Sequence, residues 1–108
     1  MRPREAMRYG DAILSVQASE AHYCSPRVDG LPLEQYRTVE VALWRVDSRR
    51  DFCRPSDLGI EGQDALFTDD HGVAAYFPWP DLQRLIAALE VRAQRQQPSR
   101  MDKQEVPA

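Results

Sequence analysis

The stretch Tyr36–Val46, with the sequence YRTVEVALWRV, decides the fold of this chain. It is rich in β-branched and aromatic residues and has no glycine or proline, which is typical of a β-strand. Alternate side chains of a strand point to opposite faces of the sheet. One alternate set is apolar and the other combines a charge with a large ring: Val39, Val41 and Leu43, against Thr38, Glu40, Ala42 and Trp44. We therefore predict a central strand with one dry face and one partly wet face.

The other strands are predicted from the same alternation. In residues 11–18 every even-numbered position is apolar: Ala12, Leu14, Val16 and Ala18. Residues 65–68 and 73–77 flank the turn-forming sequence DDHG and predict a hairpin. In its second strand we expect Val73, Ala75 and Phe77 on one face and Tyr76 on the other.

Two long connections separate these strands. Residues 19–35 contain the turn signals Ser25-Pro26 and Asp29-Gly30, and they are too many for a two-residue hairpin. We expect this loop to cross over or to wrap one face of the sheet. Residues 47–64 are polar and interrupted by proline and glycine, and they contain three predicted core anchors: Phe52, Leu58 and Ile60.

The C-terminal part of the chain carries the clearest helix signal. Pro80 suits a first helical position, and Asp81 lies in the first turn, where the helix dipole favours an acid. The apolar residues that follow recur at helical spacing: Leu82, Leu85, Ile86, Leu89 and Ala93. We expect the helix to end near Gln96, before Pro98.

These segments together predict an α+β fold, a three- to four-stranded antiparallel sheet with a C-terminal helix packed on one face. A length of 108 residues corresponds to one domain with a modest core. We assign residues 1–10 to a disordered N-terminal arm, residues 11–97 to the single α+β domain and residues 98–108 to a disordered tail.

The net charge of -3 is distributed unevenly. Residues 9–91 carry 7 arginines and 14 acidic residues, a net charge of -7, while both ends are slightly basic. An acidic body argues against a nucleic-acid groove and suits a basic partner, although acidity also simply keeps a protein soluble. The sequence contains no apolar run long enough to cross a membrane and no signal peptide, so we expect a cytoplasmic protein.

No catalytic or metal constellation stands out. The Cys and His residues are His22, Cys24, Cys53 and His71. Their spacing lacks the two close pairs of a structural zinc site. A Cys24 nucleophile with His71 as its base lacks oxyanion-hole glycines and a helix start after the cysteine. We therefore predict no metal, no cofactor and no catalytic residues, and we favour a protein without enzymatic activity.

Recognition of another protein remains as the main function class. Large aromatic rings and arginine anchor protein interfaces, and the rings here are more than so small a core can hide entirely. The alternative is that most of them pack between the sheet and the helix. The predicted partner-binding residues are His22, Tyr23, Arg27, Tyr36, Asp69, Asp70 and Trp79.

Three stretches carry a resemblance to a known group of proteins. They are ILSVQASEAHYCSPR (13–27), YRTVEVALW (36–44) and VAAYFPWPDLQRLIAAL (73–89). They resemble small, uncharacterised proteins of bacteriophages and other mobile elements, which share a Ser-x-x-His-Tyr-Cys-Ser-Pro-Arg stretch, a Tyr-x-x-Val-Glu-Val strand and a Val-x-x-Tyr-x-Pro strand end. The residues that match are Ser19, His22, Tyr23, Cys24, Ser25, Pro26, Arg27, Tyr36, Val39, Glu40, Val41, Val73, Tyr76 and Pro78. This chain departs from the pattern in its long helix end and at Trp79-Pro80.

The resemblance implies a function by direct contact. Such small acidic proteins are similar to counter-defence inhibitors, including anti-CRISPR proteins, which block a basic nucleic-acid-binding surface. We therefore expect an inhibitor that binds a host defence ribonucleoprotein complex, without binding nucleic acid or a membrane itself; formation of a homodimer is left open. The alternative is a ligand-binding or enzymatic domain centred on residues 22–27, and a third interpretation makes that loop purely structural.

Overall fold

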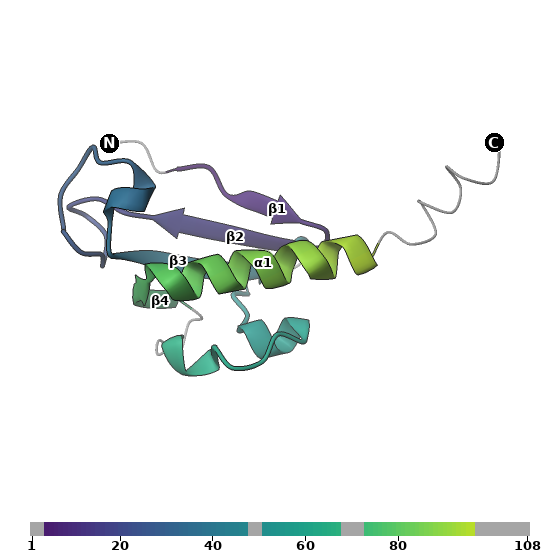
Figure 1. Ribbon diagram of the computed structural model, residues 1–108. Helices are drawn as coiled ribbons and strands as arrows, with labels where there is room; N and C mark the ends of the chain where they lie inside the picture. Colours follow the sequence, from purple (N-terminus) through teal and green to yellow (C-terminus); the bar gives the residue numbers. More distant parts are fainter. Residues whose placement is uncertain (1–3, 48–50, 68–72, 97–108) are drawn as a thin grey trace.

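Four strands form one antiparallel sheet, and a single helix covers one of its faces, in the parts of the chain that the computed structural model describes: residues 4–47, 51–67 and 73–96 (Figure 1). The strands are β1 (Met7–Tyr9), β2 (Ala12–Gln17), β3 (Thr38–Arg45) and β4 (Val73–Pro78), and they lie side by side in chain order. The helix α1 (Trp79–Arg95) follows β4 directly. The predicted α+β fold is confirmed.

Three short 3-10 helices lie in the two long connections. They are η1 (Leu33–Gln35), η2 (Pro55–Leu58) and η3 (Asp64–Leu66). The loop between β2 and β3 gathers at one end of the sheet, whereas the segment that contains η2 and η3 lies beside the helix (Figure 1). The predicted tail, residues 98–108, lies outside the described residues.

Strand β3 is the centre of the sheet, because it pairs with β2 on one side and with β4 on the other. Val39, Val41 and Leu43 are completely buried under the helix, and the opposite row of β3 is only partly covered, as predicted. On β2 the predicted apolar row is also buried, and its members pair with those of β3, Leu14 with Leu43 and Val16 with Val41. The dry face of the sheet is therefore continuous across both strands.

Helix α1 completes the core from the other side. Leu82, Leu85 and Leu89 are buried, while Ile86 is only partly covered. Burying each leucine stabilises the fold by about 1.5–3 kcal/mol before entropy is counted. The helix starts after Pro78, as its proline signal indicates, and ends at Arg95, close to the predicted end.

The prediction of a disordered arm is wrong for Met7–Tyr9, because these residues form edge strand β1; residues 1–3 lie outside the described residues. Tyr9 pairs with Ala12 across a tight turn in which Gly10 has a φ of +62°, a conformation that favours glycine. Arg8 pairs with Ile13 and Met7 with Leu14. The alternation over three residues is too short to be recognised, but the Gly10-Asp11 dipeptide between two pairing residues is a hairpin signal.

The predicted hairpin of residues 65–68 with 73–77 is wrong, because β4 pairs with β3 and Asp64–Leu66 forms η3. Phe67 then enters the core and packs edge-on against Phe77, with ring centroids 5.5 Å apart. The sequence could not decide this, because a short apolar run such as ALF (65–67) fits a strand as well as a helical turn that places one aromatic ring in the core.

Strand β4 contains a β-bulge that breaks the predicted alternation. Val39 pairs with Phe77 and Val41 pairs with Ala74, so a two-residue step on β3 faces a three-residue step on β4. Ala74 and Phe77 are therefore the buried residues of β4, instead of the predicted set of Val73, Ala75 and Phe77. The extra residue allows Tyr76 to take a φ of +54°.

Two of the three predicted anchors of the 47–64 connection contact the core. Leu58 is buried, and Ile60 packs against the core from its edge. Phe52 does not reach it: its ring is 42% exposed and lies on Trp44, on the face of the sheet that the helix leaves uncovered, with ring centroids 5.8 Å apart.

Candidate interaction site at the loop end of the sheet

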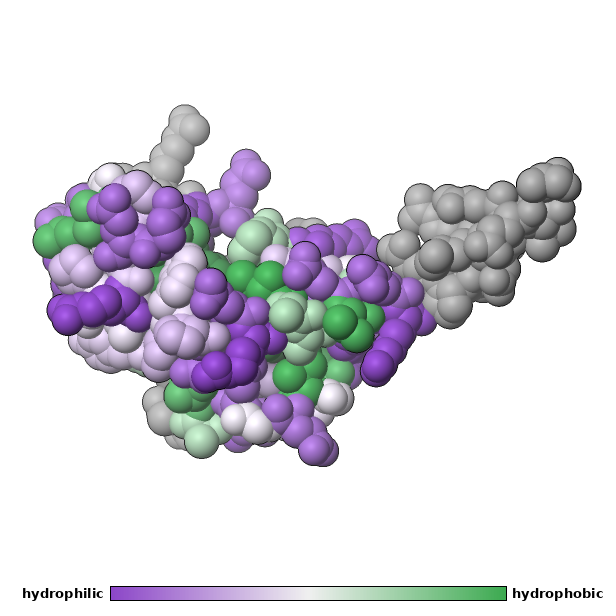
Figure 2. All heavy atoms as spheres, in the orientation of Figure 1, coloured by the Kyte–Doolittle hydropathy of each residue, from purple (hydrophilic) through white to green (hydrophobic). Residues whose placement is uncertain are grey.

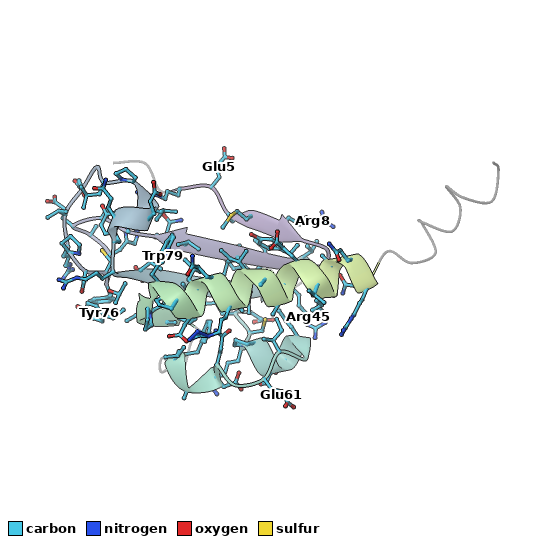
Figure 3. The ribbon with its side chains drawn as sticks, viewed as in Figure 1. Glu5, Arg8, Arg45, Glu61, Tyr76 and Trp79 are labelled. Carbon is cyan, nitrogen blue, oxygen red and sulfur yellow. The ribbon has the colours of Figure 1, made fainter. Side chains whose placement is uncertain are left out.

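Two exposed tyrosines and an arginine lie together at the end of the sheet where the loop between β2 and β3 gathers. Tyr23 is 52% exposed and Tyr76 is 48% exposed, and their ring centroids are 6.0 Å apart. The guanidinium of Arg27 lies 5.3 Å from the centre of the Tyr23 ring, within the range of a cation–π contact. We call Tyr23, Arg27 and Tyr76 the tyrosine–arginine cluster; Figure 3 shows Tyr76 at this end of the molecule.

The β-bulge directs the ring of Tyr76 outward. A non-glycine residue with a φ of +54° is uncommon, and the left-handed conformation costs a tyrosine about 1–2 kcal/mol. Its neighbours hold it there, because Ala74 and Phe77 are both completely buried. The backbone N–H of Tyr76 also donates a hydrogen bond to the carbonyl oxygen of Tyr23, at 3.0 Å. The same bulge thus exposes one ring and ties it to the loop that carries the other.

The loop is fixed to the sheet beside this contact. Ser25 forms a bridge with Thr38, the first residue of β3, and the carbonyl oxygen of Ser25 accepts a hydrogen bond from Arg37 N–H at 2.8 Å. The Ser25-Pro26 peptide bond is cis. Farther along, Arg27 Nε donates to the carbonyl oxygen of Glu20 at 3.0 Å, which leaves the face of its guanidinium against Tyr23. The cluster is therefore preformed by backbone contacts.

Tyr36, a predicted partner-binding residue, is a core residue and is only 1% exposed. Its hydroxyl donates to the carbonyl oxygen of Val28 at 2.6 Å. The guanidinium of Arg4 covers its ring at 5.8 Å and donates hydrogen bonds to the carbonyl oxygens of Ala18 and Leu31. The N-terminal segment and the loop together bury this tyrosine, so it cannot contact a partner.

The polar residues of the same loop are engaged inside it. His22 Nδ1 and Ser19 Oγ are hydrogen-bonded at 2.7 Å, and Ser19 is 2% exposed. The Sγ atom of Cys24 is buried and lies 3.3 Å from the carbonyl oxygen of Ser19. The thiol of Cys24 points into the loop, and these contacts agree with the structural interpretation of Ser19–Cys24.

Among the described residues, no group of three or more His, Cys, Asp and Glu side chains is arranged to hold a metal ion. Cys24 and Cys53 are both free thiols, and burial raises the pKa of Cys53, with the nearby Asp57 carboxylate adding to the effect. Three residues that the sequence analysis considered, Asp69, Asp70 and His71, lie outside the described residues. No helix of the described chain is long and apolar enough to cross a membrane.

Of the remaining predicted residues, Trp79 is the first residue of the helix and packs partly against the core, and its backbone N–H donates to the carbonyl oxygen of Arg37 at 3.0 Å. Of the predicted partner-binding residues, Tyr23 and Arg27 lie together in the cluster, with His22 on the same loop. Tyr76 was missed as a site residue. Its only signal is an aromatic residue in an exposed position of a strand, because the bulge that exposes it depends on pairing with β3.

A network of charged hydrogen bonds lies at the other end of the molecule, around Asp11. Asp11, in the turn between β1 and β2, is bound by the guanidinium of Arg92 and by Gln96 Nε2 at 2.9 Å. The hydrogen bond from Arg92 lowers the pKa of Asp11 to about 2, and the charges of Arg92 and Arg45 add to this effect. This network links the first hairpin to the end of α1, and its role is structural.

No family model matches the chain, and comparisons with curated proteins and with solved structures return no similar protein. The resemblance to proteins of mobile elements thus stays a prediction.

Proposed function

We propose that this chain is a small acidic binding protein without enzymatic activity, and that it contacts another protein through the tyrosine–arginine cluster. The observation that carries the proposal is the conformation of Tyr76. A left-handed tyrosine with a half-exposed ring costs stability, and such strain persists most often where it serves binding. Tyrosine and arginine are also the residues that dominate binding energy in protein interfaces.

The charge of the chain supports a class of partner. Residues 9–91 have a net charge of -7, so association with a positively charged surface is electrostatically favoured. Together with the resemblance described above, this supports an inhibitor from a mobile element that covers a basic nucleic-acid-binding surface of a host defence ribonucleoprotein. In this proposal the two tyrosine rings anchor the contact, and the acidic surface accelerates the encounter.

The experiment is affinity capture from the native host with the wild-type chain and with the double variant Tyr23→Ala and Tyr76→Ala. Loss of each anchoring ring is expected to weaken binding of the true partner by about 30-fold or more, since an anchor contributes about 2 kcal/mol or more, and loss of both should weaken it further. Phe52→Ala is the control, because it removes a similarly exposed ring from the uncovered face of the sheet. It should capture the partner as the wild type does.

A second measurement tests the inhibitory part of the proposal. The captured complex should lose its nucleic-acid binding when the wild-type chain is added, and should keep it when the double variant is added. A partner retained equally by all three chains would contradict the assigned surface. A partner that still binds nucleic acid at saturation would contradict the inhibitory mechanism.

A further inference from the structure

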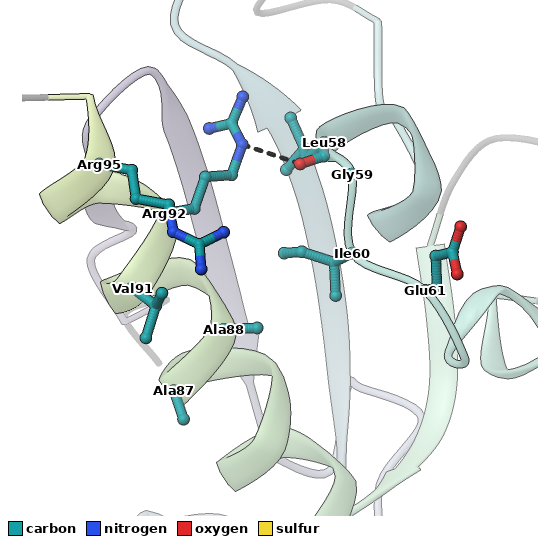
Figure 4. A pocket seen from close by; sticks show the side chains of 9 residues that line it. All are labelled: Leu58, Gly59, Ile60, Glu61, Ala87, Ala88, Val91, Arg92 and Arg95. Carbon is teal, nitrogen blue, oxygen red and sulfur yellow. Dashed lines mark hydrogen bonds between the residues drawn. The ribbon is translucent and has the colours of Figure 1, made fainter.

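A second surface, remote from the tyrosine–arginine cluster, is a groove of about 470 Å³ between the last turns of α1 and residues 58–61. Its walls are mainly aliphatic, from Leu58 and Ile60 on the loop and from Ala87, Ala88 and Val91 on the helix (Figure 4). Val91 is 46% exposed although it is a large apolar residue. Figure 2 shows that hydrophobic side chains reach the surface over the second half of the helix and beside the loop below it.

The two arginines at one end of the groove have different roles. Arg92 is committed to the fold, because its guanidinium binds Asp11 and its Nε donates to the carbonyl oxygen of Leu58 at 2.9 Å. Arg95 is exposed, and its guanidinium is directed into the groove (Figure 4). Within the described part of the chain, Arg95 forms no ion pair. Glu61 also lines the groove, but it lies on the loop, with Ile60 between its carboxylate and Arg95 (Figure 4). The groove therefore combines an aliphatic floor with the positive charge of Arg95 at its helix end.

We propose that this groove binds the C-terminal end of a partner polypeptide. The aliphatic side chain of the last residue would lie on Ala88, Val91 and Ile60, and the free α-carboxylate would bind Arg95. Charge complementarity selects this occupant: a chain terminus carries its carboxylate directly beside its last side chain, as the arrangement of floor and arginine requires. An internal apolar segment would gain no ion pair with Arg95, whose guanidinium would stay solvated by water.

The dimensions agree with a short extended segment. From Ala87 to Arg95 the helix rises about 12 Å at about 1.5 Å per residue, and an extended peptide covers that length with about four residues. The groove is shallow and Arg95 is exposed, so the contribution of the charge is modest. Loss of the ion pair should weaken binding about fivefold. The site is separate from the cluster and does not depend on the function proposed above.

The test is an NMR titration of the ¹⁵N-labelled full chain with an acetylated tetrapeptide of small apolar residues that ends in leucine. We expect shifts of the amides of Gly59, Ala88 and Val91, and about fivefold weaker binding of the same peptide with a C-terminal amide. Arg95→Gln should weaken the acid form by the same factor and leave the amide form unchanged. Arg84→Gln is the matched control, because Arg84 lies on the same helix and pairs only with Asp81 among the described residues.

Equal affinity for the acid and amide peptides, or amide shifts confined to residues outside the groove, would overturn the proposal. The variant Ala88→Trp fills the groove from the helix side and should abolish the shifts. Its helical circular dichroism should remain, because Ala88 is only partly buried. Tyr76→Ala should bind the peptide as the wild type does, so failure here and failure of the proposed function are distinguishable.

Discussion

Tyr36 and Tyr23 belong to the same loop, but Tyr36 is buried and Tyr23 is exposed. Tyr36 is 1% exposed and donates its hydroxyl proton to a backbone carbonyl, whereas Tyr23 is 52% exposed and lies against Tyr76 and Arg27. The first is part of the core, where the loop and the N-terminal segment bury it and Arg4 covers its ring. The second belongs to the tyrosine–arginine cluster, where a bulge interrupts the regular pairing. The comparison indicates that stability and recognition depend on separate residues, so substitutions should affect one without the other.

The largest effect is expected in the core. Leu85→Asp places a charge at a completely buried position under the sheet, and it should destabilise the domain by more than about 3 kcal/mol and leave it unfolded. Ile86→Asp, on the half-covered side of the same helix turn, should cost much less. Circular dichroism during thermal and urea unfolding measures both. An unchanged melting curve for Leu85→Asp would disprove the docking of α1.

The two tyrosines provide a matched pair for the next effect. Tyr36→Phe leaves the carbonyl oxygen of Val28 without its donor and should lower the free energy of unfolding by about 1–2 kcal/mol. Tyr23→Phe removes an exposed hydroxyl and should change stability by less than about 0.5 kcal/mol. Urea titration distinguishes the two. Equal losses in the free energy of unfolding would contradict the assignment of Tyr36 to the core and of Tyr23 to the surface.

The bulge predicts a change of opposite sign at neighbouring positions. Tyr76→Gly relieves the left-handed conformation, so the variant should be as stable as the wild type or more stable by up to about 1 kcal/mol. Ala75→Gly has no such strain to relieve and should lose about 0.5–1 kcal/mol. Urea unfolding compares the two variants. A larger loss in the free energy of unfolding for Tyr76→Gly than for Ala75→Gly would contradict backbone strain at Tyr76.

The final effect depends on pH and concerns Asp11. Its pKa is lowered to about 2 by Arg92, so its contribution to stability is present above the ordinary aspartate pKa and is lost as the pH falls from about 4 to about 2. Because the side chain of Asp11 is 45% exposed, solvent screening limits this contribution to about 1 kcal/mol. Asp11→Asn should remove it. The stability difference between wild type and variant should therefore shrink towards pH 2, and a constant difference would contradict the pairing with Arg92.

The core could be predicted from the sequence because its periodicities are long and uniform. The alternate apolar residues of β2 and β3 and the leucines of α1 each repeat often enough to identify one face. The three residues of β1 give too few repeats, and the bulge in β4 is set by pairing partners distant in the sequence. The same limit applies to the site. Tyr23 and Arg27 were identified, but only tertiary contacts decide that Tyr36 is buried and that Tyr76 joins the cluster.

The contacts of Arg4 have a practical consequence. Its guanidinium joins the carbonyl oxygens of Ala18 and Leu31, which lie on the loop that carries Tyr23, and its own backbone N–H donates to Gln17 Oε1 at 2.8 Å. A purification tag fused ahead of this residue would start beside the proposed recognition loop, and a protease that trims the first residues would loosen that loop without cutting it. Helix α1 ends on the side of the molecule away from the loop (Figure 1), so immobilisation for binding measurements should use the C-terminal end.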